Sequence, residues 1–199
     1  MAAQHAGWMQ NARAGCRAFD AAECYGERMH YPDLATECQV ARGARVRAVG
    51  WLAEGHVFTR GDVDAKVIPA LAQLRDEGWV HVAAAGPHEC ELCRGAREAR
   101  NILVPAPDVL YVAPAMVIHY INDHAYRPPP EFVAAVLACP APLTDEYFAG
   151  LRRFLDVFST GDPMTADDFD RWAREHRELH AHLAAERKAE AGRKRFTWD

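Results

Sequence analysis

Two short segments of the sequence have the spacing of a metal site, and we interpret the rest of the chain around them. Gly86-Pro-His-Glu-Cys-Glu-Leu-Cys93 contains a C-x2-C pair, and His119-Tyr-Ile-Asn-Asp-His-Ala-Tyr126 contains an H-x4-H pair. The 25 residues between Cys93 and His119 have the pattern of a β-hairpin that runs into a helix. Two cysteines on a turn and two histidines on a later helix are typical of zinc ligands.

The cysteine pair is the stronger half of this pattern. In a turn, thiolates three residues apart, such as those of Cys90 and Cys93, can occupy neighbouring corners of a tetrahedron around a metal. A redox dithiol of the thioredoxin kind is expected in a βαβ setting and needs no partner histidines. Inert buried cysteines are the third interpretation. We favour a metal, with zinc as the expected ion and iron as the alternative.

Three histidines compete to complete the ligand set. His119 and His124 are separated by about 140° around an ideal helix, so both reach one ion only if the helix tightens or ends between them. His88 forms an H-x-C-x-x-C pattern and would lie on the same turn as the cysteines. The candidate metal ligands are therefore His88, Cys90, Cys93, His119 and His124.

Other site chemistries lack their sequence patterns. Arg94 stands where a c-type haem motif needs histidine, no H-x-E precedes the cysteine pair as it does in zinc deaminases, and no H-E-x-x-H is present. The chain has no phosphate-binding loop or dinucleotide fingerprint, and its single serine, Ser159, has no nucleophile-elbow context. Acidic residues near the candidate ligands are possible general bases or acceptors that orient a histidine. They are Glu89, Glu91 and Asp123.

Composition limits the class of protein. With 199 residues, half of them hydrophobic, the chain suits one globular domain with a terminal extension. A net charge of -5 argues against a general nucleic-acid binder. No segment approaches the roughly 18–20 apolar residues of a membrane helix, and no signal peptide is recognisable. We therefore expect a cytoplasmic protein with no membrane or nucleic-acid partner.

The pattern of elements predicts an α+β fold: a small, mostly antiparallel sheet, a zinc knuckle-hairpin-helix unit and C-terminal helices. Strands are expected over 44–52, 79–85, 101–104 and 109–112. Helices are expected after Asp62, with Pro69 interrupting the pattern, and then over 115–125, from Pro130, over 144–158 and after Thr165. The predicted domains are an N-terminal extension (1–28), a metal-binding α+β domain (29–140) and a C-terminal helical segment packed on it (141–199).

The last predicted helix has a short apolar seam. Its members are three and four residues apart over about two heptads, which is too short to indicate a coiled coil. We expect it to pack on the domain, with dimerisation through this helix as the alternative. The seam consists of Phe169, Trp172, His176, Leu179 and Leu183.

A series of motifs along the chain resembles an uncharacterised family of small bacterial proteins. In this chain the matching segments are Gly50-Trp-Leu52, Gly55-His-Val-Phe58, Gly86 to Cys93, Leu110-Tyr-Val-Ala-Pro114 and His119 to Phe132. The resemblance covers roughly residues 29 to 140. It implies the same domain boundaries, the same site and a bacterial source, and it brings no activity.

Two functions fit these observations. In the first, zinc is structural, four protein ligands hold it, and the domain is a binding or accessory module for a protein partner. In the second, Cys90, Cys93 and one histidine hold a catalytic metal with an open position for water or a small-molecule substrate. His88 or His124 would then act as acid or base, and Tyr120 or Tyr126 would position the substrate. We favour the structural function, because no independent catalytic constellation is visible.

Overall fold

The computed structural model describes residues 30–79, 88–159 and 164–195, with side chains of the last helix described to residue 190. The N-terminal extension predicted for residues 1–28 lies outside the described residues, as does nearly all of the strand predicted for 79–85.

Within the described residues, the main sheet has three short strands: β1 (Val46–Ala48), β4 (Asn101–Pro105) and β5 (Leu110–Pro114). β5 is the central strand, antiparallel to β4 and parallel to β1. The predicted hairpin is therefore confirmed. β1 is shorter than predicted because Gly50 adopts a left-handed φ of 72°, which ends the extended conformation.

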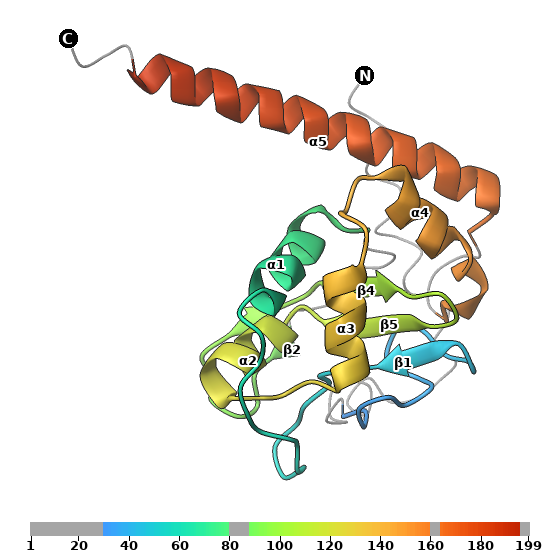
Figure 1. The fold of residues 1–199 in the computed structure, drawn as a ribbon, viewed down its shortest axis with the longest axis vertical. Helices are drawn as coiled ribbons and strands as arrows, with labels where there is room; N and C mark the ends of the chain where they lie inside the picture. The colour runs from blue at the N-terminus through green and yellow to red at the C-terminus, as the bar shows by residue number, and fades with distance from the viewer. Residues whose placement is uncertain (1–29, 80–87, 160–163, 196–199) are drawn as a thin grey trace, which may run out of the picture.

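Helices cover this sheet so completely that every residue of β4 and β5 is buried. Helices α1 (Val67–Glu77) and α3 (Pro130–Ala138) pack against β4 and against each other, and α4 (Asp145–Arg152) also contacts β4 (Figure 1). This burial explains the nearly continuous apolar sequence of the two strands.

The beginning of α1 corrects one prediction. Asp62 does not cap this helix, which begins at Val67 after Lys66. Pro69 therefore lies in the first turn, where a missing N–H breaks no helical hydrogen bond. Just before the helix, the Asp64 side chain accepts a hydrogen bond through Oδ1 from the Lys66 backbone N–H at 2.8 Å.

A second, smaller unit holds the candidate site. Strands β2 (His88–Glu89) and β3 (Arg97–Glu98) form an antiparallel pair, and the turn between them contains both cysteines. We call residues 88–98 the knuckle. Helix α2 (Val117–His124) carries both histidines of the second segment. Together with the main sheet, these elements confirm the α+β fold class.

The C-terminal part is helical, as predicted. The Thr144 side chain caps α4 by accepting from the Tyr147 backbone N–H, but α4 ends at Arg152. A 3-10 turn, η2 (Leu155–Val157), follows in place of the predicted continuous helix to residue 158. Helix α5 (Ala166–Arg195) begins after Thr165, whose side chain accepts from the Asp168 backbone N–H at 3.2 Å.

The first turns of α5 are attached to the domain through aromatic side chains. Phe169 is buried and packs edge-on against Trp79, with ring centroids 4.9 Å apart. His176 lies 3.1 Å, through Nε2, from the Glu77 carbonyl oxygen at the end of α1. The far end of α5 projects beyond the domain in Figure 1. Among the described residues, no helix combines the length and apolarity needed to cross a membrane.

Candidate metal centre

Four of the five candidate ligands converge on one point between the knuckle and α2. The ligand atoms of Cys90, Cys93, His119 and His124 all lie within 4.8 Å of one another. The Cys90 sulfur is 3.4 Å from His124 Nε2, and the Cys93 sulfur is 3.3 Å from His119 Nε2. The two Nε2 atoms are 3.2 Å apart.

These separations can be compared with the edges of a coordination tetrahedron. Zinc bonds of about 2.3 Å to sulfur and about 2.05 Å to nitrogen imply tetrahedral edges of about 3.6 Å for S···N and about 3.3 Å for N···N. The three separations in the structure are within about 0.3 Å of these edges. The cluster therefore has the size and donor set to hold a metal ion.

The knuckle positions the two sulfurs through its backbone. The Arg94 N–H donates to the Cys90 carbonyl oxygen at 2.7 Å, and Arg94 has a left-handed φ of 55°, which makes the turn tight. The Gly95 N–H then points at the Cys93 sulfur at 3.3 Å. The backbone N–H groups of Cys93 and Leu92 point at the Cys90 sulfur in the same way. Such N–H groups stabilise thiolates.

The two cysteines differ in exposure. Cys90 is fully buried, whereas Cys93 is exposed. Burial raises the pKa of the Cys90 thiol, and the N–H groups of Cys93 and Leu92 act in the opposite direction. A buried sulfur with a raised pKa needs a nearby positive charge to remain a thiolate, and a metal ion supplies that charge.

The end of α2 explains how two histidines five residues apart meet. His124 is the last helical residue, and Ala125 follows in the left-handed conformation with φ of 53°. The N–H groups of Ala125 and Tyr126 both donate to the Tyr120 carbonyl oxygen, the latter at 3.0 Å, so the last turn is wider than an ordinary α-helical turn. The Arg60 guanidinium donates to the His124 carbonyl oxygen at 2.8 Å, which places a cation at the negative end of the helix.

Asp123 orients one of the histidines. Its Oδ2 lies 2.5 Å from Nδ1 of His119, one helical turn earlier. A carboxylate only accepts, so the His119 proton is on Nδ1, and the Nε2 lone pair is free to face the cluster. This carboxylate–histidine pair is the usual partner arrangement of a metal-binding histidine. Burial lowers the pKa of His124, which favours the neutral form that a ligand needs.

His88 lies outside the cluster. Its Nε2 is 3.2 Å from the Tyr120 hydroxyl, which in turn donates to the Leu52 carbonyl oxygen at 3.3 Å. Since the single hydroxyl proton goes to Leu52, His88 must donate through Nε2. Burial also lowers the pKa of His88. The His88 side chain therefore joins the knuckle to Tyr120 on α2 by a hydrogen bond beside the cluster.

The other two acidic candidates make structural contacts within the knuckle. Glu89 pairs with Arg97 across the β2–β3 ladder at 2.8 Å. Glu91 accepts a hydrogen bond from the Glu54 backbone N–H at 3.1 Å and so ties the knuckle to the loop after β1. Neither contact indicates a general base.

Tyr126 is fully buried beside α2. Its hydroxyl donates to Asp33 Oδ1 at 2.7 Å, and the same oxygen accepts from the Gly50 N–H at 2.9 Å. Burial raises the pKa of Tyr126, and the neighbouring Asp33 carboxylate raises it further. Sequence reasoning missed this link because Asp33 lies 93 residues earlier in the chain.

Comparison with known proteins gives one match. A family described as a domain of unknown function (DUF7919) matches residues 29–137, which is 109 of 199 residues. The chain belongs to this family. No curated protein and no solved structure matches the chain. The DUF7919 domain contains all four residues of the cluster, whereas α4, η2 and α5 follow it. Membership of an uncharacterised family is confirmed, and the bacterial source stays a prediction.

Proposed function

We propose that this DUF7919 domain binds one structural zinc ion through Cys90, Cys93, His119 and His124, and that the domain serves as a binding or accessory module. The observation that carries the proposal is the set of S···N and N···N separations, which match the edges of a zinc tetrahedron. Thiolate ligands also suit a reducing compartment, so we propose a cytoplasmic location.

The ligand set favours zinc over iron. Two thiolates and two imidazoles in a tetrahedral arrangement are a familiar structural zinc site. Non-haem iron oxygenase sites of the facial-triad kind use two histidines and one carboxylate instead. The Asp123 carboxylate contacts His119 and is better suited to orienting that ligand.

A structural role is favoured over a catalytic one because the protein supplies four converging ligand atoms. A catalytic zinc keeps a position open for water or substrate. The catalytic alternative also gave roles to His88, Tyr120 and Tyr126. The hydroxyls of both tyrosines are engaged in the fold, and both side chains are fully buried. Nothing about these three residues supports acid–base chemistry or substrate positioning.

The proposed ion would join two elements that are far apart in the chain. Cys93 and His119 are 26 positions apart, and the knuckle has only two short strands of its own. A two-stranded hairpin is marginally stable in water, so a metal bridge to α2 would fix its position. For comparison, structural zinc contributes about 10–16 kcal/mol in zinc-finger peptides.

Metal content of cysteine variants tests the proposal. Wild-type protein purified without an affinity tag is expected to contain one zinc per chain. Cys90→Ser and Cys93→Ser should lose the zinc and unfold at lower temperature. Cys139→Ser, at a half-buried cysteine outside the cluster, is the matched control and should retain the zinc. Equal zinc content in all three variants would contradict the ligand assignment.

A further inference from the structure

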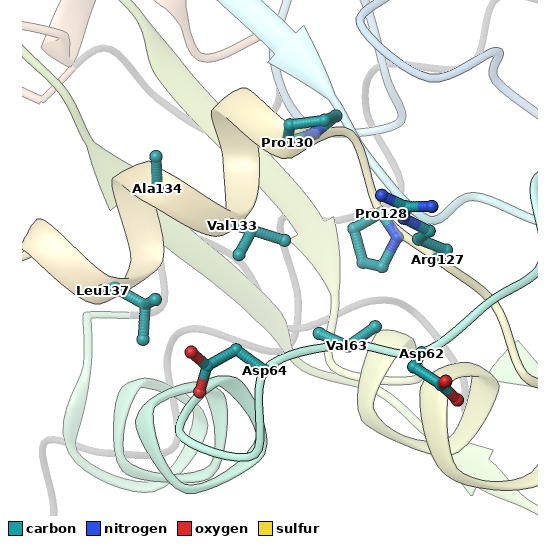
Figure 2. A pocket seen from close by; sticks show the side chains of 9 residues that line it. All are labelled: Asp62, Val63, Asp64, Arg127, Pro128, Pro130, Val133, Ala134 and Leu137. Atoms are coloured by element: carbon teal, nitrogen blue, oxygen red, sulfur yellow. The ribbon is translucent and has the colours of Figure 1, made fainter.

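A groove of about 350 Å³ lies between the segment 62–64 and helix α3 (Figure 2). One wall consists of Val133, Ala134 and Leu137 on α3. Val63 lies opposite this wall, and Pro128 lies at one end of the groove. Figure 2 shows the Val133 and Leu137 side chains directed from α3 toward the 62–64 segment. The groove is separate from the metal cluster, since no lining residue belongs to that cluster.

The apolar wall is accessible. Leu137 is 43% exposed, one of the few large apolar side chains with this much exposure in the described part of the chain. Val133 lies one helical turn earlier and is partly buried. Exposed aliphatic side chains along a groove are a common feature of surfaces that bind another chain.

The opposite side of the groove has unpaired backbone. Across residues 30–79, 88–159 and 164–195, no hydrogen bond partner is found for the backbone N–H and C=O groups of Asp62 and Val63. Their neighbours are paired: the Gly61 N–H donates to the Ala125 carbonyl oxygen, and the Asp64 carbonyl oxygen accepts from the Val67 N–H. Unpaired backbone beside apolar side-chain positions is what an extended peptide uses when it adds to a protein edge.

The charge of the groove is complementary to a basic ligand. Asp62 and Asp64 are both exposed, and neither forms an ion pair within the described residues. The Asp64 carboxylate is directed toward the α3 wall near Leu137 in Figure 2. Arg127 is the single cation among the lining residues, so the groove has a net negative charge.

We propose that this groove binds an extended segment of a partner protein in which aliphatic residues alternate with lysine or arginine. Backbone groups of the segment would pair with Asp62 and Val63, its aliphatic side chains would contact Val133 and Leu137, and its cations would face Asp64. The inference rests on the proposed function as a binding module and names the class of partner.

The groove is also connected to the metal cluster through the backbone. Arg127 and Pro128 lie three and four residues after the end of α2, and an isolated β-bridge joins Tyr126 to Arg60. The Arg127 N–H donates to the Thr59 carbonyl oxygen at 2.9 Å, just before the 62–64 segment. A metal that fixes the end of α2 would therefore also fix this end of the groove.

Selection of peptides provides the test. Random heptapeptides displayed on phage are selected on the metal-loaded 199-residue chain, and the enriched peptides are synthesised with a fluorescent label for anisotropy titration. We expect enriched peptides to alternate aliphatic residues with lysine or arginine. N-methylation of their central amides should abolish binding, because it removes the backbone donors.

Three variants locate the binding. Leu137→Glu places a carboxylate on the apolar wall and should weaken binding at least about tenfold, since a charge would be buried without a partner. Val57→Glu makes a comparable change at a fully exposed valine that does not line the groove, and it should leave affinity unchanged. Asp62→Asn with Asp64→Asn should weaken binding and reduce its salt dependence.

Several results would overturn the inference: no enriched peptide, enrichment of acidic peptides, or equal binding to wild type and Leu137→Glu. Zinc content is measured on each sample. Protein with one zinc per chain that fails these tests would refute the groove and leave the structural zinc intact. Protein without zinc would refute the proposed zinc site, and the peptide data would still decide the groove.

Discussion

The contact between Asp123 and His119 leads to the most informative mutation near the candidate site. Asp123→Asn keeps an oxygen that can accept the Nδ1 proton but removes the negative charge. Asp123→Ala removes both. The two variants therefore separate the orienting effect of the acceptor from the electrostatic effect of the carboxylate on a metal-bound imidazole.

The expected loss of zinc affinity follows from the short contact of Asp123 with His119 and from the exposure of the Asp123 side chain. Mutation of residues that support a metal ligand usually weakens metal binding by about 10–100-fold. The 2.5 Å separation indicates a charge-assisted hydrogen bond, which is among the stronger kinds. However, the Asp123 side chain is 61% exposed, so water screens its charge. We expect about tenfold weaker zinc binding for Asp123→Asn, or about 1.4 kcal/mol, and a larger loss for Asp123→Ala.

Competition with a chromogenic zinc chelator at neutral pH measures this loss. Asp108→Asn, at an exposed aspartate in the turn between β4 and β5, is the matched control and should bind zinc like the wild type. Unchanged zinc affinity in both Asp123 variants would refute the reasoning, because His119 would then need no orienting partner.

Two further substitutions test how the fold supports α2, and both are followed by urea unfolding of metal-loaded protein. Tyr126→Phe removes a buried hydroxyl that donates to Asp33, and should cost about 1.5–3 kcal/mol; a loss below 0.5 kcal/mol, on the order of a neutral surface change, would contradict this. Gly50→Ala combines a left-handed φ with a Cβ 2.8 Å from Val117 Cγ2, and should cost about 2–4 kcal/mol. The same Gly50→Ala change should cost less in a Val117→Ala background, where Cγ2 is absent; an equal loss in both backgrounds would show that the Val117 contact is unimportant.

Local sequence patterns were sufficient for most elements. The β4–β5 hairpin, the proline that opens α3 and the caps of α4 and α5 are determined by neighbouring residues, and the structure has them where they were predicted. The parallel pairing of β1 with β5 joins residues such as Val46 and Leu110 that are distant in sequence, so no local pattern indicates it. The early end of β1 depends on Gly50, whose conformation is tied to Asp33.

In the candidate site, too, some features are set by neighbouring residues and others by residues distant in the sequence. The spacing of Cys90 and Cys93 within one turn is a local signal, which made the cysteine pair easy to recognise. The choice among the histidines depends on where α2 ends, and Arg60, 64 positions before His124, contributes to that end. The position of Asp123 four residues after His119 was a usable signal for an orienting carboxylate, although Glu89 and Glu91 were equally near in sequence.

X-ray absorption at the zinc edge, with elemental analysis of the same untagged sample, tests the central claim most directly. The structural zinc site predicts one zinc per chain with two sulfur neighbours at about 2.3 Å and two nitrogen neighbours at about 2.0–2.1 Å. A shell with an exchangeable oxygen in place of one protein ligand would contradict the closed site and favour the catalytic alternative. Protein that contains no metal would contradict the site itself.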